Sequence, residues 1–444
     1  MAGQGAETEV VSIDDLLERV RREGPVLAFQ NDVVGIFDPT LAVKVDKANT
    51  DLHTVPDSLI DFLGLRGSAA PVAWREVRAL LSEQGGRLAA PDHMRTLYTR
   101  MHTFLSERCG PDHDLSELSW WAISEPLLPL LIGGMNPRDT NALVGEQKTR
   151  YSGIVKQNFS FLRRIVNFHL SRKAARTVSR HIKRRARGTA PAQDDFLQSL
   201  LPLVDRIGVD RVAYLVSTVL AGMSGLPGIT AASLLYAMHR YPEWRERIQA
   251  ETSALDLESL YTLPMKALPC TSRFIKETIR VWPGLFALRR PAWHDIEAEG
   301  ITIKKGAAYE LSSYFQHHSP EFWDSPDVFD PDRWLPSRRQ PNKGAYVPFG
   351  FSSRACIGSA VGHAQLVLFC ALVTRDFDIQ VRTDPAPWMQ LEGFAIPIDF
   401  RGVVTPRRIH AAAARPAASQ DAAQGCPYAA AARAPAAHAD PLTE

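Results

Sequence analysis

The sequence of 444 residues has few of the features that mark disulfide-stabilised, metal-clustered or nucleic-acid-binding proteins. Its five cysteines lie far apart and form no Cys-x-x-Cys pair, which argues against a disulfide framework and against a structural zinc site. Lysine and arginine number 51 against 49 aspartates and glutamates, so the net charge of +2 gives no reason to expect a nucleic acid as partner.

Long apolar stretches are also missing. No unbroken apolar run is long enough to cross a bilayer, and the first 24 residues carry acidic side chains where a signal peptide would be basic and apolar. The sequence therefore predicts a soluble, cytoplasmic protein without a membrane anchor.

The residues that are present favour a large helical domain. Hydrophobic residues make up 45% and charged residues 23% of the chain, which is typical of a globular protein with a sizeable core. A hairpin-like pattern over 25–46 precedes a mainly helical pattern over 55–290, and short strand-like pieces follow, with one further helix near 358–374. Because strands do not alternate regularly with helices, a doubly wound sheet is disfavoured and a mainly α fold with small β-sheets is expected.

The composition changes sharply at the carboxyl end. Residues 410–444 are rich in alanine and proline and poor in large apolar side chains, so they cannot bury much surface and are expected to be disordered. We therefore predict one folded domain over 25–409, preceded by an N-terminal segment over 1–24.

A strongly basic helix is predicted over 161–188. Such a helix usually presents a solvated face, and the alternative is a docking surface for an acidic partner or an anionic membrane. The sequence leaves both interpretations open.

One cysteine has surroundings suited to metal binding. Cys356 stands in the loop that begins at Phe349, at the start of a helical pattern, where free amide donors and the helix dipole favour a thiolate. Phe349 would shield the sulfur, Arg354 would pair with an anionic cofactor group, and Gly358 would allow close backbone approach. These features suit a metal-bound thiolate in a protected pocket, although a buried structural cysteine remains the better explanation when they are taken alone.

This loop resembles the haem-binding loop of the cytochrome P-450 superfamily, Phe-x-x-Gly-x-Arg-x-Cys-x-Gly. The match includes Phe349, Arg354, Cys356 and Gly358, and it departs from the pattern at Ser352, where the family usually has glycine. The resemblance implies a cytochrome P-450 fold, mainly α with small β-sheets, and one haem b whose iron takes Cys356 as its axial ligand.

Two further segments resemble the same superfamily in the same order along the chain. Glu277 and Arg280 match its Glu-x-x-Arg helix, and Arg333 lies in a Phe-Asp-Pro-Asp-Arg-Trp segment like the one that supplies a second arginine. The resemblance implies a buried network of these three side chains that holds the core around the haem loop.

The two haem propionates need cationic or hydrogen-bonding partners in a mostly apolar pocket. By resemblance, Pro91 opens the helix that contributes such partners, but the arginine usual four residues after His93 is replaced here by Leu97. Arg100, one turn further on, is the substitute candidate. The predicted propionate partners are therefore His93, Arg100, Arg290 and Arg354.

The helix predicted over 209–239 departs from the resemblance. The superfamily carries an acid followed by an alcohol there, which manage water and protons during dioxygen activation, whereas this chain has Ser224 and Gly225 at those two positions. Protons would then come through Ser224, water or the substrate, or the protein would not activate dioxygen at all. Pro227 is expected to kink or locally unwind the helix.

The resemblance implies an oxidoreductase. The leading interpretation is a monooxygenase of secondary metabolism that inserts one oxygen atom into a lipophilic or biosynthetic small molecule, with NAD(P)H-derived electrons delivered by a separate ferredoxin or flavodoxin and its reductase. The alternatives are a haem-thiolate isomerase, dehydratase or peroxygenase, and a non-catalytic haem ligand binder. The substrate-facing candidates by family position are Met223, Leu285, Phe286 and Phe394.

Overall fold

The structure is a computed structural model in which the described residues are 13–30, 32–49, 74–156, 161–262, 264–341, 344–350 and 355–407. Arg354 and the tail over 410–444, which carry predictions made above, lie outside the described residues.

Helices dominate the described chain. The longer ones are α1 (Ile13–Glu23), α2 (Pro39–Ala48), α4 (Trp74–Leu88), α5 (Pro91–Ser106), α6 (Leu115–Leu131), α7 (Pro137–Lys156), α8 (Phe161–Ala186), α11 (Val209–Arg240), α12 (Pro242–Ser253), α15 (Pro269–Val281) and α17 (Ser359–Arg375). The shorter ones are α9 (Phe196–Leu200), α10 (Val204–Ile207), α13 (Leu257–Thr262), α14 (Pro264–Ala267), α16 (Ser313–His318) and the 3₁₀ helices η1 (Leu201–Leu203) and η2 (Pro331–Trp334).

The strands are short and form four small sheets. They are β1 (Val26–Phe29), β2 (Val33–Ile36), β3 (Asp112–Asp114), β4 (Ala287–Pro291), β5 (Ile296–Ala298), β6 (Ile301–Ile303), β7 (Ala308–Ser312), β8 (Phe377–Val381), β9 (Trp388–Glu392), β10 (Phe394–Ile398) and β11 (Arg401–Pro406). The sheet orders are β1-β2-β7-β4, β3-β11-β8, β9-β10 and β5-β6. The expectation of a mainly α fold with small β-sheets is confirmed.

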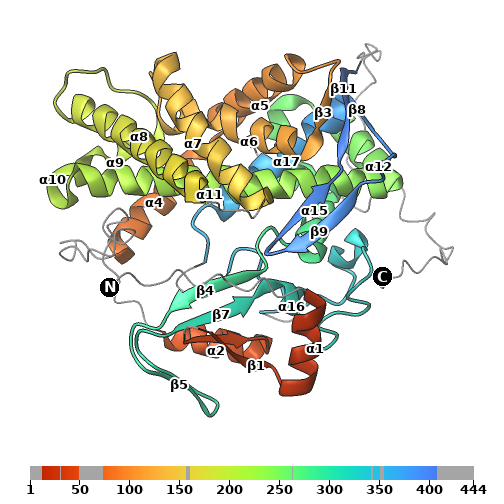
Figure 1. Ribbon diagram of the computed structural model, residues 1–444. Helices are drawn as coiled ribbons and strands as arrows, with labels where there is room; N and C mark the ends of the chain where they lie inside the picture. Colours follow the sequence, from red (N-terminus) through yellow and green to blue (C-terminus); the bar gives the residue numbers. More distant parts are fainter. Residues whose placement is uncertain are drawn as a thin grey trace.

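Helix α11 is the axis of the fold. It crosses the molecule with α5 to α8 on one side and the sheet that contains β4 and β7 on the other (Figure 1). Residues 228–238 of α11 are buried without interruption, because α6, α15, α17 and β10 all pack around this half of the helix. Within the described ranges, α11 is the one helix long and apolar enough to cross a membrane, but half of its most apolar window lies inside the protein, as expected of a central core helix.

The kink or local unwinding predicted at Pro227 is not seen as unwinding. Helix α11 is α-helical from Val209 to Arg240, with Pro227 inside it. Local unwinding was expected because proline removes one backbone hydrogen bond, but the packing of α6 along the helix supports the helical path on both sides of the proline.

The N-terminal elements join a sheet completed by a much later segment. Strands β1 and β2 form the predicted hairpin, with Val26 opposite Ile36, and β2 pairs in parallel with β7. Figure 1 shows these red elements beside the teal β4 and β7. The hairpin pattern predicted over 25–46 is correct only to Ile36, because Asp38 caps α2 by accepting a 2.6 Å hydrogen bond from the Leu41 amide, and Pro39 occupies the first helical turn.

Candidate functional site

The cysteine loop, which we define as the described residues 344–350 and 355–358, leads into α17. The Cys356 amide donates a 2.7 Å hydrogen bond to the Phe349 carbonyl, which holds these two pieces of the loop together. Gly350 has a left-handed backbone with φ of +70°, so this turn favours glycine. Gly358 caps α17, and a Cβ atom built on it would lie 4.0 Å from the Cys356 sulfur.

The Cys356 thiol differs from the other described cysteines. Cys356 is exposed, whereas Cys270 and Cys370 are buried and Cys109 is intermediate. Partial burial raises the pKa of the Cys356 thiol. The Gly358 amide and the Arg78 charge act in the opposite direction. A positive centre bound to the sulfur would supply the stabilisation that the thiolate lacks here.

Arg78 of α4 is a functional candidate that sequence reasoning missed. Its Nη2 atom donates a 2.5 Å hydrogen bond to the Ala355 carbonyl, one residue before the cysteine. A Cβ atom built on Gly85 would lie 3.8 Å from the Ile357 carbonyl oxygen, which shows that α4 lies along the cysteine loop. The sequence did contain a signal for Arg78. No arginine stands four residues after His93, but Arg78 stands four residues after Trp74.

The predicted partners on α5 lie elsewhere. His93 Nδ1 is 3.0 Å from the Arg87 carbonyl and its Nε2 is 3.9 Å from Asp194. Arg100 is exposed, whereas Leu97, which was expected to share its helix face, is buried in the core. Among the described contacts, neither His93 nor Arg100 reaches the cysteine loop, so these two predictions receive no support from the geometry.

Arg290 approaches the cysteine loop from β4. Its Nη2 atom would lie 3.6 Å from a Cβ atom built on Gly350. Its Nε atom is 3.2 Å from Asp46 Oδ1, and the Asp46 side chain is fully buried and also accepts a 2.9 Å hydrogen bond from the Tyr309 hydroxyl. Asp46 therefore fixes Arg290 beside the loop.

The structure brings Glu277, Arg280 and Arg333 together. Arg280 Nη2 is 2.8 Å from Glu277 Oε1, and Arg333 Nε is 3.0 Å from the same oxygen. Glu277 and Arg280 have fully buried side chains, and the Trp334 indole donates to Glu277 Oε2 at 2.9 Å. A buried charge is tolerated when it is paired and fully hydrogen-bonded, which is the case here.

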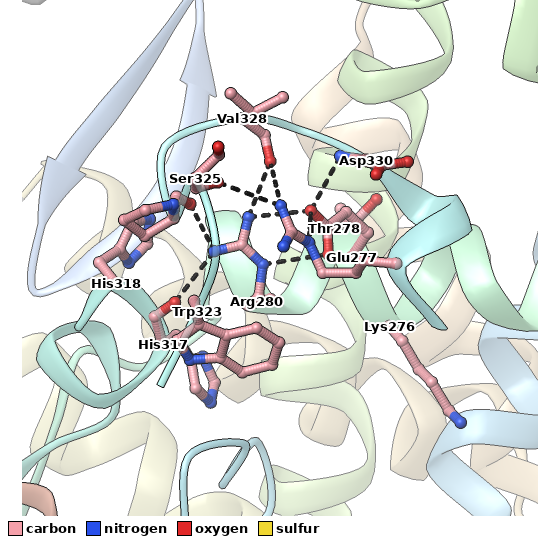
Figure 2. Close-up of polar contacts among 12 residues, drawn as sticks. Lys276, Glu277, Thr278, Arg280, His317, His318, Trp323, Ser325, Val328 and Asp330 are labelled. Carbon is pink, nitrogen blue, oxygen red and sulfur yellow. Dashed lines mark hydrogen bonds and ion pairs between the residues drawn. The ribbon is translucent and has the colours of Figure 1, made fainter. Parts of the chain in front are cut away.

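This network is linked to the cysteine loop through His317. Arg280 Nη1 donates to the His317 carbonyl at 2.9 Å, and Figure 2 shows Arg280 between Glu277 and the carbonyl oxygens of His317 and Val328. The ring nitrogen Nε2 of His317 accepts a 3.0 Å hydrogen bond from the Val347 amide, within the loop. Burial lowers the pKa of His317 well below its ordinary value, so the ring is neutral and can accept. The network thereby positions the loop that carries Cys356.

Ser224 of α11 faces another helix. Its hydroxyl donates to the Leu220 carbonyl and accepts a 3.2 Å hydrogen bond from Gln147 Nε2 of α7. Cβ atoms built on Gly225 and Gly228 would lie 3.7 Å and 3.1 Å from Trp120 of α6. Ser224 and Gly225, the two positions singled out from the sequence, therefore belong to the contacts of α11 with α7 and α6.

A different row of residues along α11 is exposed to solvent. Thr218, Gly222 and Leu226 are exposed at a spacing of four residues, and Leu226 keeps 39% of its surface accessible. Gly284 lies beside this stripe, since a Cβ atom on it would be 3.7 Å from the Leu226 carbonyl. An apolar side chain left open on the central helix suits contact with a bound apolar molecule.

Two of the three segments that carry predicted substrate contacts lie side by side. The Phe286 amide donates to the Gly393 carbonyl at 3.1 Å, which places the segment after α15 beside the turn between β9 and β10. Leu285 and Phe394, the neighbours of these two residues, are partly buried. Met223, by contrast, is buried within α11 at 8% exposure and belongs to the core cluster.

The donor set fits an anionic iron macrocycle. It offers an accessible thiol at a helix N-terminus, a glycine that leaves the space beside the sulfur free, and arginines Arg78 and Arg290 on two sides of the cysteine loop. A thiolate is a ligand for haem iron, and guanidinium groups are strong partners for carboxylates.

The helical fold and the thiol loop together define a protein of the haem-thiolate class. The family model described as Cytochrome P450 matches residues 135–402, which is more than half of the chain, and the chain belongs to this family.

Similar proteins agree with this assignment. A sterol 14alpha-demethylase of Mycolicibacterium vanbaalenii is 27% identical over 201 residues, which cover 43% of this chain and 44% of that protein. A pentalenene oxygenase of Streptomyces avermitilis is 29% identical over 199 residues, with the same two coverages. The aligned segments thus span less than half of these relatives.

Solved structures extend the similarity of fold to nearly the whole chain. A retinoic acid-bound cyanobacterial CYP120A1 superposes with a TM-score of 0.74 at 18% identity, covering 90% of this chain and 95% of that one. A zebrafish cytochrome P450 with progesterone gives a TM-score of 0.70 at 18% identity, covering 88% and 99%.

Proposed function

We propose that this protein is a haem-thiolate monooxygenase that inserts one oxygen atom into a lipophilic small molecule. The observation that carries the proposal is the accessible Cys356 thiol at the start of α17, held by a loop that the Glu277 network positions and that Arg78 and Arg290 flank. Haem, when bound, supplies the redox chemistry of dioxygen activation.

The residues of this chain would hold that group and prepare its surroundings. Cys356 would bind the iron as thiolate, and Arg78 and Arg290 would neutralise the two propionates. Asp46 would keep Arg290 in place through the 3.2 Å ion pair, so that the guanidinium loses little freedom on binding.

The open stripe of α11 would form one wall of the substrate site. Leu226, Phe286 and Phe394 would bind apolar surface and exclude water from it. The Ser224 proton is engaged by the Leu220 carbonyl, so protons would be supplied by water or by a polar group of the substrate at the stripe rather than by Ser224.

The substrate class rests on these apolar residues and on the relatives. Proteins similar to this chain are named for a sterol and for an ultra-long-chain fatty acid, and both compounds are lipophilic. A role in secondary metabolism is suggested by the similarity to a pentalenene oxygenase. Electrons would come from NAD(P)H through a ferredoxin or flavodoxin and its reductase.

A second candidate function has its own support. An isomerase, dehydratase or peroxygenase needs no reductive activation of dioxygen, and the neutral Ser224 and Gly225 at the acid and alcohol positions are compatible with such a reaction. The remaining alternative is a non-catalytic haem ligand binder, which would carry out neither the monooxygenase reaction nor these other reactions.

The test has two stages. First, the haem-loaded protein is reduced under carbon monoxide, and we expect the red-shifted absorption of a thiolate-ligated ferrous complex, which C356H should abolish while retaining haem. Second, a lipophilic candidate substrate is incubated with oxygen and a surrogate ferredoxin system, with peroxide, or with neither. Product only in the first arm supports the monooxygenase. Product without electrons supports the second candidate and overturns the first, and spectral shifts without product in any arm indicate a ligand binder.

A further inference from the structure

A small pocket lies between the first turn of α7 and the second half of α8, apart from the site described above. Its volume is about 210 Å³. Apart from Ala142, the residues that line it have polar or charged side chains: Arg138, Asp139, Lys173, Arg176, Thr177 and Arg180.

The one carboxylate in the lining is already neutralised. Asp139 is 5% exposed and its two oxygens are 2.8 Å from Arg180 Nη1 and 2.9 Å from His181 Nε2. Burial acts to raise the pKa of Asp139, but the hydrogen bonds from His181 and Arg180 outweigh it and lower the pKa overall. Asp139 therefore remains a carboxylate whose charge is used by its own partners.

The three remaining cations have no such counterion. Arg138, Lys173 and Arg176 are exposed, and the ion pairs found within the described part of the chain include none of them. Lys173 and Arg176 stand three residues apart on α8, where like charges repel each other, and Arg138 faces them from α7. Three unpaired positive charges thus gather around one concave site.

We propose that this pocket binds a phosphate-bearing small molecule. A phosphate group carries up to two charges and three acceptor oxygens, which matches guanidinium groups that donate two parallel hydrogen bonds and an ammonium group that adds a point charge. The amino-terminal end of α7, to which Arg138 belongs, adds the positive end of a helix dipole. The proposal is independent of the reaction at Cys356.

The experiment uses inorganic pyrophosphate as the probe and titrates it calorimetrically into the haem-loaded full-length protein at constant ionic strength. We expect saturable binding with one site per chain. The double variant K173Q/R176Q should weaken binding about tenfold or more, because each lost charge-assisted contact removes a sizeable part of the affinity.

The control variant K183Q/R184Q removes two positive charges from the same helix outside the pocket, and it should bind pyrophosphate within about twofold of the unaltered protein. Equal weakening by both double variants, or no saturable binding at all, would overturn the proposal. Sedimentation with phosphatidic acid vesicles separates the two sources of phosphate. Vesicle binding that needs Lys173 and Arg176, without binding of pyrophosphate, would replace the soluble ligand with a lipid headgroup and overturn the proposal as stated. The carbon monoxide spectrum of each variant should be unchanged, which keeps this test separate from that of the proposed function.

Discussion

Gln147 Nε2 donates a 3.2 Å hydrogen bond to Ser224 Oγ, and this contact joins α7 to α11. Gln147 is 2% exposed, and within the described part of the chain its Oε1 atom has no hydrogen-bond partner. The serine hydroxyl donates its own hydrogen bond to the Leu220 carbonyl. A neutral amide–hydroxyl pair thus occupies the buried contact, and its first role is to hold the two helices together.

Replacing this serine tests that role. S224A should lower the free energy of unfolding by about 1–3 kcal/mol, because it leaves the buried Gln147 amide unpaired, and it should change turnover little. Urea denaturation and product formation are the measurements. S217A, which removes another α11 serine bonded one turn back, is the matched control and should cost less. A large loss of turnover with full stability in S224A would instead show that Ser224 delivers protons.

Neutralising Glu277 tests the buried network. E277Q should destabilise the protein by about 3–5 kcal/mol, because Arg280 and Arg333 would be left without a buried counter-charge. The exposed pair of Glu258 and Arg95 provides the control, and E258Q should cost much less, because a solvent-exposed ion pair contributes little to stability. Both values come from urea denaturation of the haem-loaded protein, and similar costs for the two variants would contradict the structural role of the network.

The rate of haem loss can show which arginines bind the haem propionates. R78Q and R290Q should each weaken haem retention by about 1–3 kcal/mol, because each removes a charge-assisted contact beside the cysteine loop. R100Q should leave retention unchanged, since Arg100 is exposed on α5. The rate of haem transfer to an excess of an apo-acceptor protein measures this. Faster loss from R100Q than from R78Q would restore the assignment made from sequence alone.

The stability of the protein should depend on pH through a buried histidine. Burial lowers the pKa of His318 to about 4, and its ring stacks on Tyr314 with centroids 4.1 Å apart. Because the folded-state pKa is below the unfolded value of about 6.5, this contribution is fully present above pH 6.5 and is lost as the pH falls toward 4.

Through His318, the free energy of unfolding should fall by up to about 1.4 kcal/mol for each pH unit below 6.5. H318F keeps an aromatic ring over Tyr314 and should flatten the fall between pH 6.5 and 4, as measured by urea midpoints at several pH values. The exposed His102 provides the control, and H102F should keep the slope of the unaltered protein. An unchanged slope in H318F would show that other groups carry the pH dependence.

Features that depend on neighbouring residues in the chain could be predicted. The position of Cys356 just before a helix N-terminus could be predicted, because a glycine- and serine-rich loop precedes an apolar helical pattern there. The Asp38–Pro39 start of α2 was also readable, as a cap followed by proline, but the β-branched residues around it favoured a longer hairpin.

The sequence could not show which helix lies against the cysteine loop, and so it could not show which cation lies beside Cys356. His93 and Arg78 lie on consecutive helices, and either helix satisfies the same pattern of apolar spacing. Only the packing of α4 on the loop, seen at Gly85 and Ile357, places Arg78 beside the cysteine.

The amino-acid sequence alone indicated the family and the order of the network residues, and it predicts Cys356 as the ligand, because short motifs carry this information through local spacing. The tertiary structure alone decided that Ser224 faces α7 and that Leu226 lies open, and it gathered the unpaired cations of α7 and α8 around one pocket. The direction of a side chain on a helix has no meaning until other elements pack around that helix, and those contacts join residues that are far apart in the chain.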